Sequence, residues 1–383
     1  MKTRLKTVLT AGFAVFSMFF GSGNLVFPLV IGVSTAGNAA FSTMGLIVTG
    51  VVMPFLGLLG IILFDGNWRR FFISIGKIPA FVLVFMLLSL LGPFGVIPRC
   101  ILVTYGGASL WMPWLPFEVF SIIFCVITAL LIWNHDRVIP IIGRVLTPWL
   151  ILGVVVIILA GLMANVGSEP NGVEPVKAFM IGLFEGYQTM DLLAAFFFSA
   201  AAIEYLKRYL NKREEAMLSK WSLVACCIGA GLIALVYVGF VALGAKFSSH
   251  LVGVSPEQML AYIASLALGK FAVPVVSVTI ALACLTTATI LAMLFSDFVH
   301  EDILRKRFNP HVSLVATLVI SFFMSEVGFC SLRVFLGTVL EMVYPALIIF
   351  TLSNIIAQIW KIDFSRYAFW GALVVSVYLR FIW

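Results

Sequence analysis

Apolar segments of about 20 residues recur along this chain from end to end, separated by short polar stretches. Hydrophobic residues make up 62% of the 383 positions and charged residues only 11%, with a mean hydropathy of +1.13. Soluble domains do not reach such values, so we expect an all-α polytopic membrane protein with about 11 transmembrane helices. The predicted spans cover residues 8–31, 41–64, 79–106, 117–133, 140–163, 178–205, 219–244, 271–298, 312–326, 331–357 and 367–382.

The basic residues lie mainly in alternate loops between these spans. With the N-terminus placed in the cytoplasm, eighteen of the 24 Lys and Arg residues fall on the cytoplasmic side. The other six are Arg99, Lys177, Lys246, Lys270, Arg333 and Arg380. This asymmetry follows the positive-inside rule. The net charge of +7 therefore indicates orientation in a bilayer rather than binding to nucleic acid.

The first apolar segment is interrupted at its centre by Gly21, Ser22, Gly23 and Asn24, with Pro28 following. Glycine weakens a helix by about 1 kcal/mol and proline by about 3 kcal/mol. Freed backbone groups in lipid cost several kcal/mol unless protein or a ligand satisfies them. The stretch is therefore typical of a discontinuous transporter helix with a binding site at mid-membrane. The alternative is a glycine-rich face on which helices pack.

The sixth span carries a matching interruption, from Glu185 to Asp191. Spans 1–5 and 6–10 form two sets of five, and an odd number inverts the second set relative to the first. Interruptions at corresponding positions of two such halves favour a transport site over a packing face. We expect residues 1–163 to form the first repeat, 164–177 an outside loop, 178–357 the second repeat and 358–383 an extra helix.

The eighth span contributes hydroxyl groups in the run from Ala283 to Thr289, with Thr286 and Thr287 adjacent. Hydroxyl and freed carbonyl oxygens suit a weakly bound monovalent cation. The alternative is that the threonines bond to their own helix backbone.

Four stretches, in order, resemble motifs of the branched-chain amino acid:cation symporters (the LIVCS family, BrnQ type), within the amino acid–polyamine–cation superfamily. They are residues 20–28, 92–99, 186–195 and 340–345. The resemblance implies a LeuT-type 5+5 inverted repeat with discontinuous helices 1 and 6. It also implies Na⁺-coupled uptake of leucine, isoleucine and valine across a bacterial cell inner membrane. The family usually has twelve spans, and here eleven are expected.

By the same resemblance, Ala283, Thr286 and Thr287 correspond to a sodium site whose other ligands are main-chain carbonyls near Ser17 and Phe20. Backbone at the two interruptions is expected to hold the amino and carboxylate groups of the substrate. The predicted substrate-binding residues are Gly21, Ser22, Gly23, Asn24, Tyr187, Gln188, Thr189, Met190 and Asp191. Ile97, Met190 and side chains of the eighth span are candidates for the apolar pocket.

Ionisable residues at membrane depth are functional candidates. Asp191 is expected either to cap the second half of span 6 or to contact the ion or the substrate amine. Glu341 is expected to act at a gate or carry a proton, or else to pair with Arg99 or Arg333. Arg99 and Glu185 complete the set of gate or ion-pair candidates, and Arg99 is expected to be structural rather than a substrate ligand.

The sequence thus predicts a secondary active transporter with Na⁺ as coupling ion and no cofactor. Proton coupling, another neutral substrate such as methionine, and an amino acid sensor that does not transport are the alternatives. A membrane enzyme is disfavoured, because the spans hold no cluster of His, Asp and Glu.

Overall fold

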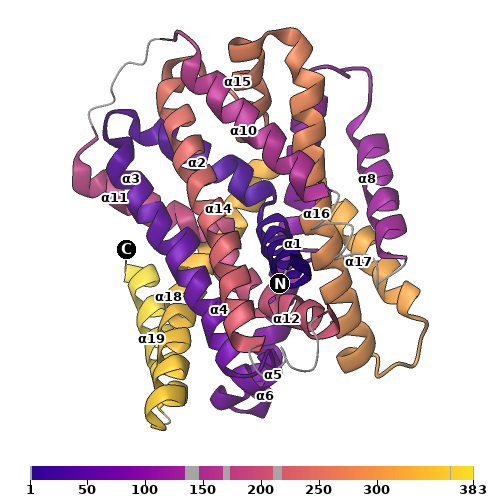
Figure 1. Cartoon of the computed structure of the whole chain (residues 1–383), viewed down its shortest axis with the longest axis vertical. Coiled ribbons are helices and arrows are strands. Elements are labelled where there is room, and N and C mark those ends of the chain that lie inside the picture. The colour runs from indigo at the N-terminus through magenta and orange to yellow at the C-terminus, as the bar shows by residue number, and fades with distance from the viewer. Residues whose placement is uncertain (1, 134–145, 167–172, 210–217, 363, 383) are drawn as a thin grey trace.

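The computed structural model describes residues 2–133, 146–166, 173–209, 218–362 and 364–382 of the chain. Every regular element within these residues is a helix, and the helices form a single bundle (Figure 1). The predicted outside loop 164–177 and the start of the predicted span 140–163 lie partly outside the described residues.

The first span is broken, as the sequence predicts. Helix α1 (Lys2–Phe19) ends two residues before α2 (Ser22–Thr35) begins. Gly21 between them has an extended backbone, with φ −123° and ψ −153°. Its N–H donates to the side-chain oxygen of Asn24 at 3.4 Å, instead of to the carbonyl of Ser17 one turn earlier. The carbonyl of Ser17, near the end of α1, therefore lacks this helical donor and is available to groups on other helices.

The sixth span is broken in a different way. Helix α11 (Pro175–Glu185) runs into a tight 3₁₀ turn, η5 (Gly186–Thr189), and α12 (Asp191–Tyr209) follows. Met190 joins them in the left-handed conformation with φ 60°, which is uncommon for a residue other than glycine. The two halves of the span are bent by 44° relative to each other.

The remaining predicted spans also coincide with helices. The third consists of α6 (Lys77–Leu91) and α7 (Val96–Ala108), which are separated by a short turn that contains Pro93. The others are α3 (Ala39–Ile47), η2 (Val48–Val52) and α4 (Met53–Leu63); α8 (Phe117–Ile132); α10 (Thr147–Met163); α14 (Leu218–Lys246); α16 (Val273–Phe298); α17 (Pro310–Ser325); α18 (Phe329–Trp360); and α19 (Ser365–Ile382). Short helices α5 (Trp68–Phe72) and α15 (Met259–Leu268) lie between spans.

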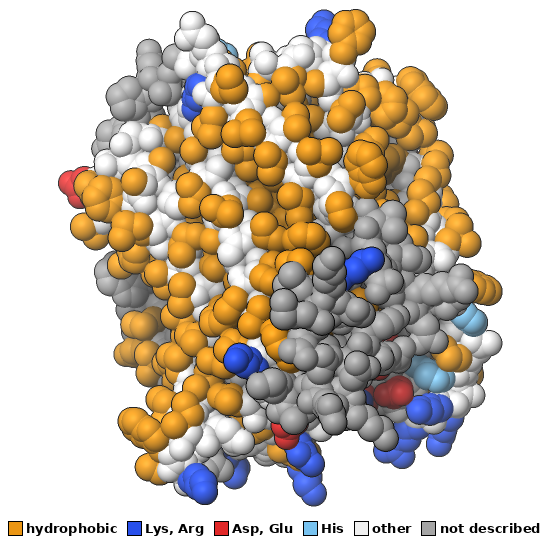
Figure 2. Space-filling view, viewed as in Figure 1, with side chains coloured by type: hydrophobic (Ala, Val, Ile, Leu, Met, Phe, Trp, Pro, Cys, Tyr) orange, Lys and Arg blue, Asp and Glu red, His pale blue; other side chains and the backbone are white. Residues whose placement is uncertain are grey.

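Length and composition support a membrane-spanning bundle. Among the described residues, five helical segments are long and apolar enough to cross a bilayer, and the bent pair of span 6 makes a sixth. Four shorter apolar helices accompany them. Figure 2 shows one broad face covered by hydrophobic side chains, with Lys and Arg mostly along its lower edge. Such a surface is expected of helices that face lipid.

The helices pack in two groups. In the first, α1 and α2 both lie against α14, while α3 lies against α11 and α4 against α12. In the second, α7, α8, α16 and α17 contact one another. The two broken spans therefore belong to the same group, and α16 of the second group contacts both halves of the first broken span. The candidate site lies where these groups meet.

Candidate functional site

The two breaks face each other at very short range. A Cβ atom added at Gly23 would lie 3.1 Å from the Cα of Thr189. A Cβ atom at Gly21 would lie 2.8 Å from the hydroxyl oxygen of Thr287 on α16. Glycine suits both positions because a Cβ atom would force the backbone of the second break or the side chain of Thr287 to shift away from the first break.

A buried hydrogen-bond network joins the two breaks. The side-chain amide of Asn24 donates to both carboxylate oxygens of Asp191, at 3.0 and 2.9 Å. The hydroxyl of Tyr237 on α14 donates to the same carboxylate at 2.5 Å. Asp191 is 2% exposed and is the first residue of α12, where an acidic group suits the positive end of the helix dipole. Asp191 therefore lies at the start of the helix, where it was expected if it caps the second half of span 6. Its side chain, however, forms hydrogen bonds with α2 and α14.

A small cavity of about 10 Å³ lies at this junction, with room for about one water molecule. Its polar lining includes Ser22, Asn24, Thr189, Asp191 and Thr287. Its apolar lining is Phe19, Leu91, Val96, Met190, Ala194, Phe198 and Leu291. A larger molecule therefore fits only if some of these side chains move.

The two threonines of α16 face the released end of α1. The hydroxyl of Thr286 lies 3.2 Å from the carbonyl oxygen of Ser17 and 2.8 Å from that of Ala283. The hydroxyl of Thr287 lies 3.4 Å from the same Ser17 carbonyl. The Ser17 hydroxyl is itself buried without a hydrogen-bond partner. Two hydroxyls and two carbonyls therefore converge at the predicted cation site, and the threonines are not confined to bonding their own helix.

Phe20, the remaining residue predicted near the cation, lies directly in the break after α1. Its N–H still donates to the carbonyl of Phe16 at 2.9 Å, and its ring stacks on that of Phe16. The helical bonding of α1 thus persists up to Phe20.

Arg99 on α7 is fully buried and holds the unwound part of span 6. Its guanidinium donates to the carbonyl of Gln188 at 3.1 Å and contacts the sulfur of Met190 at 2.9 Å. It also lies over the ring of Phe27, with 5.3 Å between the guanidinium carbon and the ring centre. Arg99 therefore contacts the second break and is not among the residues that line the small cavity.

Two of the gate or ion-pair candidates form ion pairs, and the partner of Glu341 differs from those predicted. Glu185 at the end of α11 pairs with Arg333 of α18. Glu341 pairs with Arg380 of α19, at 3.1 Å, and not with Arg99 or Arg333. The predicted partners of Glu341 were wrong because its side chain points away from the bundle interior, where Arg99 lies.

Other predicted residues support the second break. The ring of Tyr187 stacks on that of Tyr344, with centres 4.4 Å apart. The hydroxyl of Tyr344 accepts the backbone N–H of Leu192 at 3.1 Å, so α18 satisfies one of the free N–H groups at the start of α12. The side-chain amide of Gln188 donates to the carbonyl of Arg333 at 3.2 Å.

Comparison with known proteins identifies the family to which the chain belongs. The family model described as "Branched-chain amino acid transport protein" matches residues 4–381. The chain belongs to this family. The branched-chain amino acid permease BrnQ of Corynebacterium glutamicum is 29% identical, over 98% of this chain and 87% of that protein. The permease of the same name from Bacillus subtilis is 28% identical, over 94% of this chain and 83% of that protein.

Solved structures agree on the fold of this family member. MHP1, a nucleobase-cation-symport-1 family transporter in a closed conformation with bromovinylhydantoin bound, superposes with a TM-score of 0.61 at 14% identity. The match covers 97% of this chain and 91% of that one. A manganese transporter of Eremococcus coleocola superposes with a TM-score of 0.56 at 14% identity, over 98% and 86% of the two chains. The superpositions support a LeuT-type fold with broken first and sixth helices, and membership of the transport-protein family makes the protein a transporter and not an enzyme.

The sequence reasoning found only part of the apolar lining of the cavity: Met190 lines it, as does Leu291 of the eighth span, but Phe19, Leu91, Val96, Ala194 and Phe198 were missed. Ile97 is fully buried but does not line the cavity, whereas its neighbour Val96 does. Ala194 and Phe198 follow Asp191 at helical spacing, and Leu291 follows Thr287 by one turn. Helical periodicity places these three on the same helix faces as Asp191 and Thr287, but it does not show that those faces meet.

We predict that bulk at Gly23 damages transport more than loss of the hydroxyl at Ser22. Gly23→Ala should reduce amino acid uptake moderately and Gly23→Leu by about tenfold or more, because the added atoms meet the backbone of Thr189. Uptake is measured in cells and normalised to the amount of protein in the membrane. Ser22→Ala is the matched control, and normal uptake by Gly23→Leu would contradict this account of the break.

Proposed function

We propose that this protein is a Na⁺-coupled symporter that takes up leucine, isoleucine and valine by alternating access. The cavity between the two breaks carries the proposal, because it joins a carboxylate and free backbone groups on one side to an uncharged apolar wall on the other. Those are the two chemical requirements of a zwitterionic amino acid with an aliphatic side chain. The names of the related permeases of Corynebacterium glutamicum and Bacillus subtilis support the same substrate class.

The polar groups of the substrate would bind between the breaks. The N-terminus of α2 begins at Ser22, and its free N–H groups suit the substrate carboxylate. Asp191, buried beside the cavity, suits the ammonium group. Pro28 has no N–H to donate to the carbonyl of Asn24, so that oxygen is a further acceptor at the same place.

The aliphatic side chain of the substrate would face Val96 of α7, Ala194 and Phe198 of α12, and Leu291 of α16. None of these side chains can ionise or form a hydrogen bond. A polar or charged substrate side chain would lose its hydration there without compensation, whereas a branched aliphatic chain would not.

The coupling cation would bind among the oxygens of Ser17, Ala283, Thr286 and Thr287. Na⁺ fits this set because it binds neutral oxygens through charge and dipole alone, as at other sites on unwound transporter helices. Ser17 belongs to the first packing group and the threonines to the second. A bound cation would therefore join the two groups and favour the arrangement in which the cavity is complete.

Transport would follow from rocking of the group that contains α1, α2, α11, α12 and α14 against the group that contains α7, α8, α16 and α17. The separate packing of these groups supports this motion. We further propose that residues 1–163 and 178–357 are the two inverted repeats, and that the N-terminus faces the cytoplasm of a bacterial cell in its inner membrane.

Uptake assays in proteoliposomes test the coupling ion. We predict that leucine uptake rises with external Na⁺ and collapses when choline replaces it. Uptake that is unchanged without Na⁺ but is abolished when the proton gradient is dissipated would establish proton coupling instead. Binding of leucine without accumulation would identify a sensor. If methionine competes better than the branched-chain amino acids, methionine would be the preferred substrate.

The same assay tests the ion site. The double variant Thr286→Ala, Thr287→Ala should raise the Na⁺ concentration for half-maximal uptake by about tenfold, because two of the ligating oxygens are lost. Thr279→Ala is the control, since Thr279 lies on the same helix and its hydroxyl donates to the carbonyl of Val275 at 3.0 Å, one turn earlier in that helix. An unchanged Na⁺ dependence in the double variant would remove these hydroxyls from the site.

We predict that Asp191 recognises the ammonium group of the substrate. Asp191→Asn keeps an oxygen for Asn24 and Tyr237 but removes the negative charge, so leucine affinity should fall by about tenfold or more. The deaminated analogue 4-methyl-2-oxopentanoate should bind wild type weakly and should bind the Asp191→Asn variant more tightly. Binding to purified protein is measured by calorimetry, with Glu118→Gln on the exposed start of α8 as the control. Equal affinity of wild type for both ligands would exclude this role.

We predict that Ala194 sets the size of the apolar pocket. Ala194→Leu fills space beside the cavity, so it should raise KM for leucine and isoleucine about tenfold more than KM for valine. The ratio of KM values is measured for all three substrates in one preparation. A ratio equal to that of wild type would place the aliphatic side chain elsewhere.

A further inference from the structure

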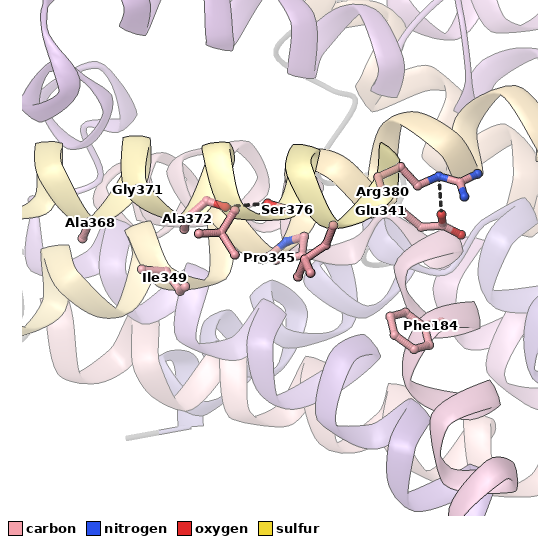
Figure 3. A pocket seen from close by; sticks show the side chains of 11 residues that line it. Phe184, Glu341, Pro345, Ile349, Ala368, Gly371, Ala372, Ser376 and Arg380 are labelled. Atoms are coloured by element: carbon pink, nitrogen blue, oxygen red, sulfur yellow. Dashed lines mark hydrogen bonds and ion pairs between the residues drawn. The ribbon is translucent and has the colours of Figure 1, made fainter. Parts of the chain in front are cut away.

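A groove of about 720 Å³ opens on the outside of the bundle, remote from the small cavity between the breaks. It lies between α18 and α19, with Phe184 of α11 at one end (Figure 3). Its walls are apolar over most of their length, with Ile349 and Pro345 on α18 and Ala368 and Ala372 on α19. Gly371 also lines it, and a Cβ atom added there would meet nothing within 4 Å. The groove therefore has unfilled space beside a wall of small residues.

One end of the groove is charged. Arg380 and Glu341 form an ion pair there, with 3.1 Å between the Nε and Oε2 atoms, and their side chains are 41% and 45% exposed. Figure 3 shows the pair at the end of the groove where Phe184 also lies. Pro345 has no N–H, so the backbone carbonyl of Glu341 lacks its usual helical donor. The end thus presents a guanidinium, a carboxylate and a free carbonyl oxygen together.

Because α18 is long and apolar enough to cross a bilayer, we infer that the groove on its exposed side faces lipid, where exposed charges are costly unless something polar meets them. The distance along α19 from Ala368 to Arg380 is about 18 Å, at 1.5 Å per residue. The groove therefore has the form that an amphiphile fits, with a long apolar trough and a polar head at one end. A long arginine side chain near a helix end is also the kind of group that reaches lipid headgroups.

We propose that this groove is a binding site for a phospholipid with a primary ammonium headgroup, such as phosphatidylethanolamine. The phosphate contacts Arg380, the ammonium contacts the carboxylate and free carbonyl of Glu341, and one acyl chain lies along α19 toward Ala368. A choline headgroup has no N–H to donate to these acceptors. A purely anionic headgroup satisfies Arg380 but leaves Glu341 facing negative charge.

The groove is connected to the transport site through Tyr344, which immediately precedes Pro345. The hydroxyl of Tyr344 accepts the N–H of Leu192 at 3.1 Å, and its ring stacks on that of Tyr187. A lipid seated against Pro345 therefore touches the helix that supports the second break. Lipid bound in the groove is therefore expected to change the rate of transport.

Native mass spectrometry of the purified full-length protein tests this site. Protein is mixed with equal amounts of phosphatidylethanolamine and phosphatidylcholine, and the retained lipid is counted. Wild type should retain phosphatidylethanolamine in preference by about tenfold. The double variant Glu341→Gln, Arg380→Gln should lose this preference. Lys270→Gln, which changes an exposed charge elsewhere, should keep it.

A second variant tests the trough without altering any charge. Gly371→Leu places a side chain in open space, so it should fold normally and exclude the acyl chain. Retention of phosphatidylethanolamine should then fall by about tenfold. Equal retention of the two lipids by wild type, or unchanged retention in both variants, would overturn the proposal. A lipid-free complex of two chains that Gly371→Leu dissociates would assign the groove to a second copy instead.

Discussion

The structure depends on one constraint, which is that every backbone group freed inside a membrane must find a partner within the protein. The first and sixth spans both release such groups at mid-length. Their partners come from one another and from two continuous helices, α16 and α18: the carbonyl of Ser17 meets the threonines of α16, and the N–H of Leu192 meets Tyr344. Glycine at positions 21 and 23 makes these contacts possible by allowing backbone to approach neighbouring helices directly. The breaks, the proposed cation site and the proposed substrate cavity are therefore consequences of one arrangement.

The same arrangement explains how binding could be linked to motion. The proposed substrate cavity is formed largely by the breaks of one packing group, whereas the proposed cation site uses oxygens from both groups. Asp191 lies within the first group, tied to Asn24 and Tyr237, so its position does not depend on the cation. Arg99 reaches from the second group to the unwound part of span 6. A ligand that bridges these groups stabilises one arrangement of the two groups relative to another. Such a shift is the physical requirement for alternating access.

The groove beside α19 has a different chemistry from the central site. At the centre, polar groups are buried and are paired mostly within the protein. At the groove, the Glu341–Arg380 pair is nearly half exposed to surroundings that are apolar along most of the wall. The proline that follows Tyr344 lies between these two regions, on a helix that contributes to both. The outer surface of α18 and the transport site are thus parts of one continuous packing unit.

The sequence by itself determined the all-helical membrane fold, the positions of both breaks and the threonine pair, because apolar length, glycine and proline act locally along the chain. It could not assign the apolar wall, since Val96, Ala194 and Leu291 come from three helices whose mutual rotation no local pattern records. It also predicted the wrong partners for Glu341, because span and depth do not fix the direction in which a side chain points. Only the tertiary structure decided which faces meet, since each contact joins residues far apart in the chain and depends on how all the helices pack at once.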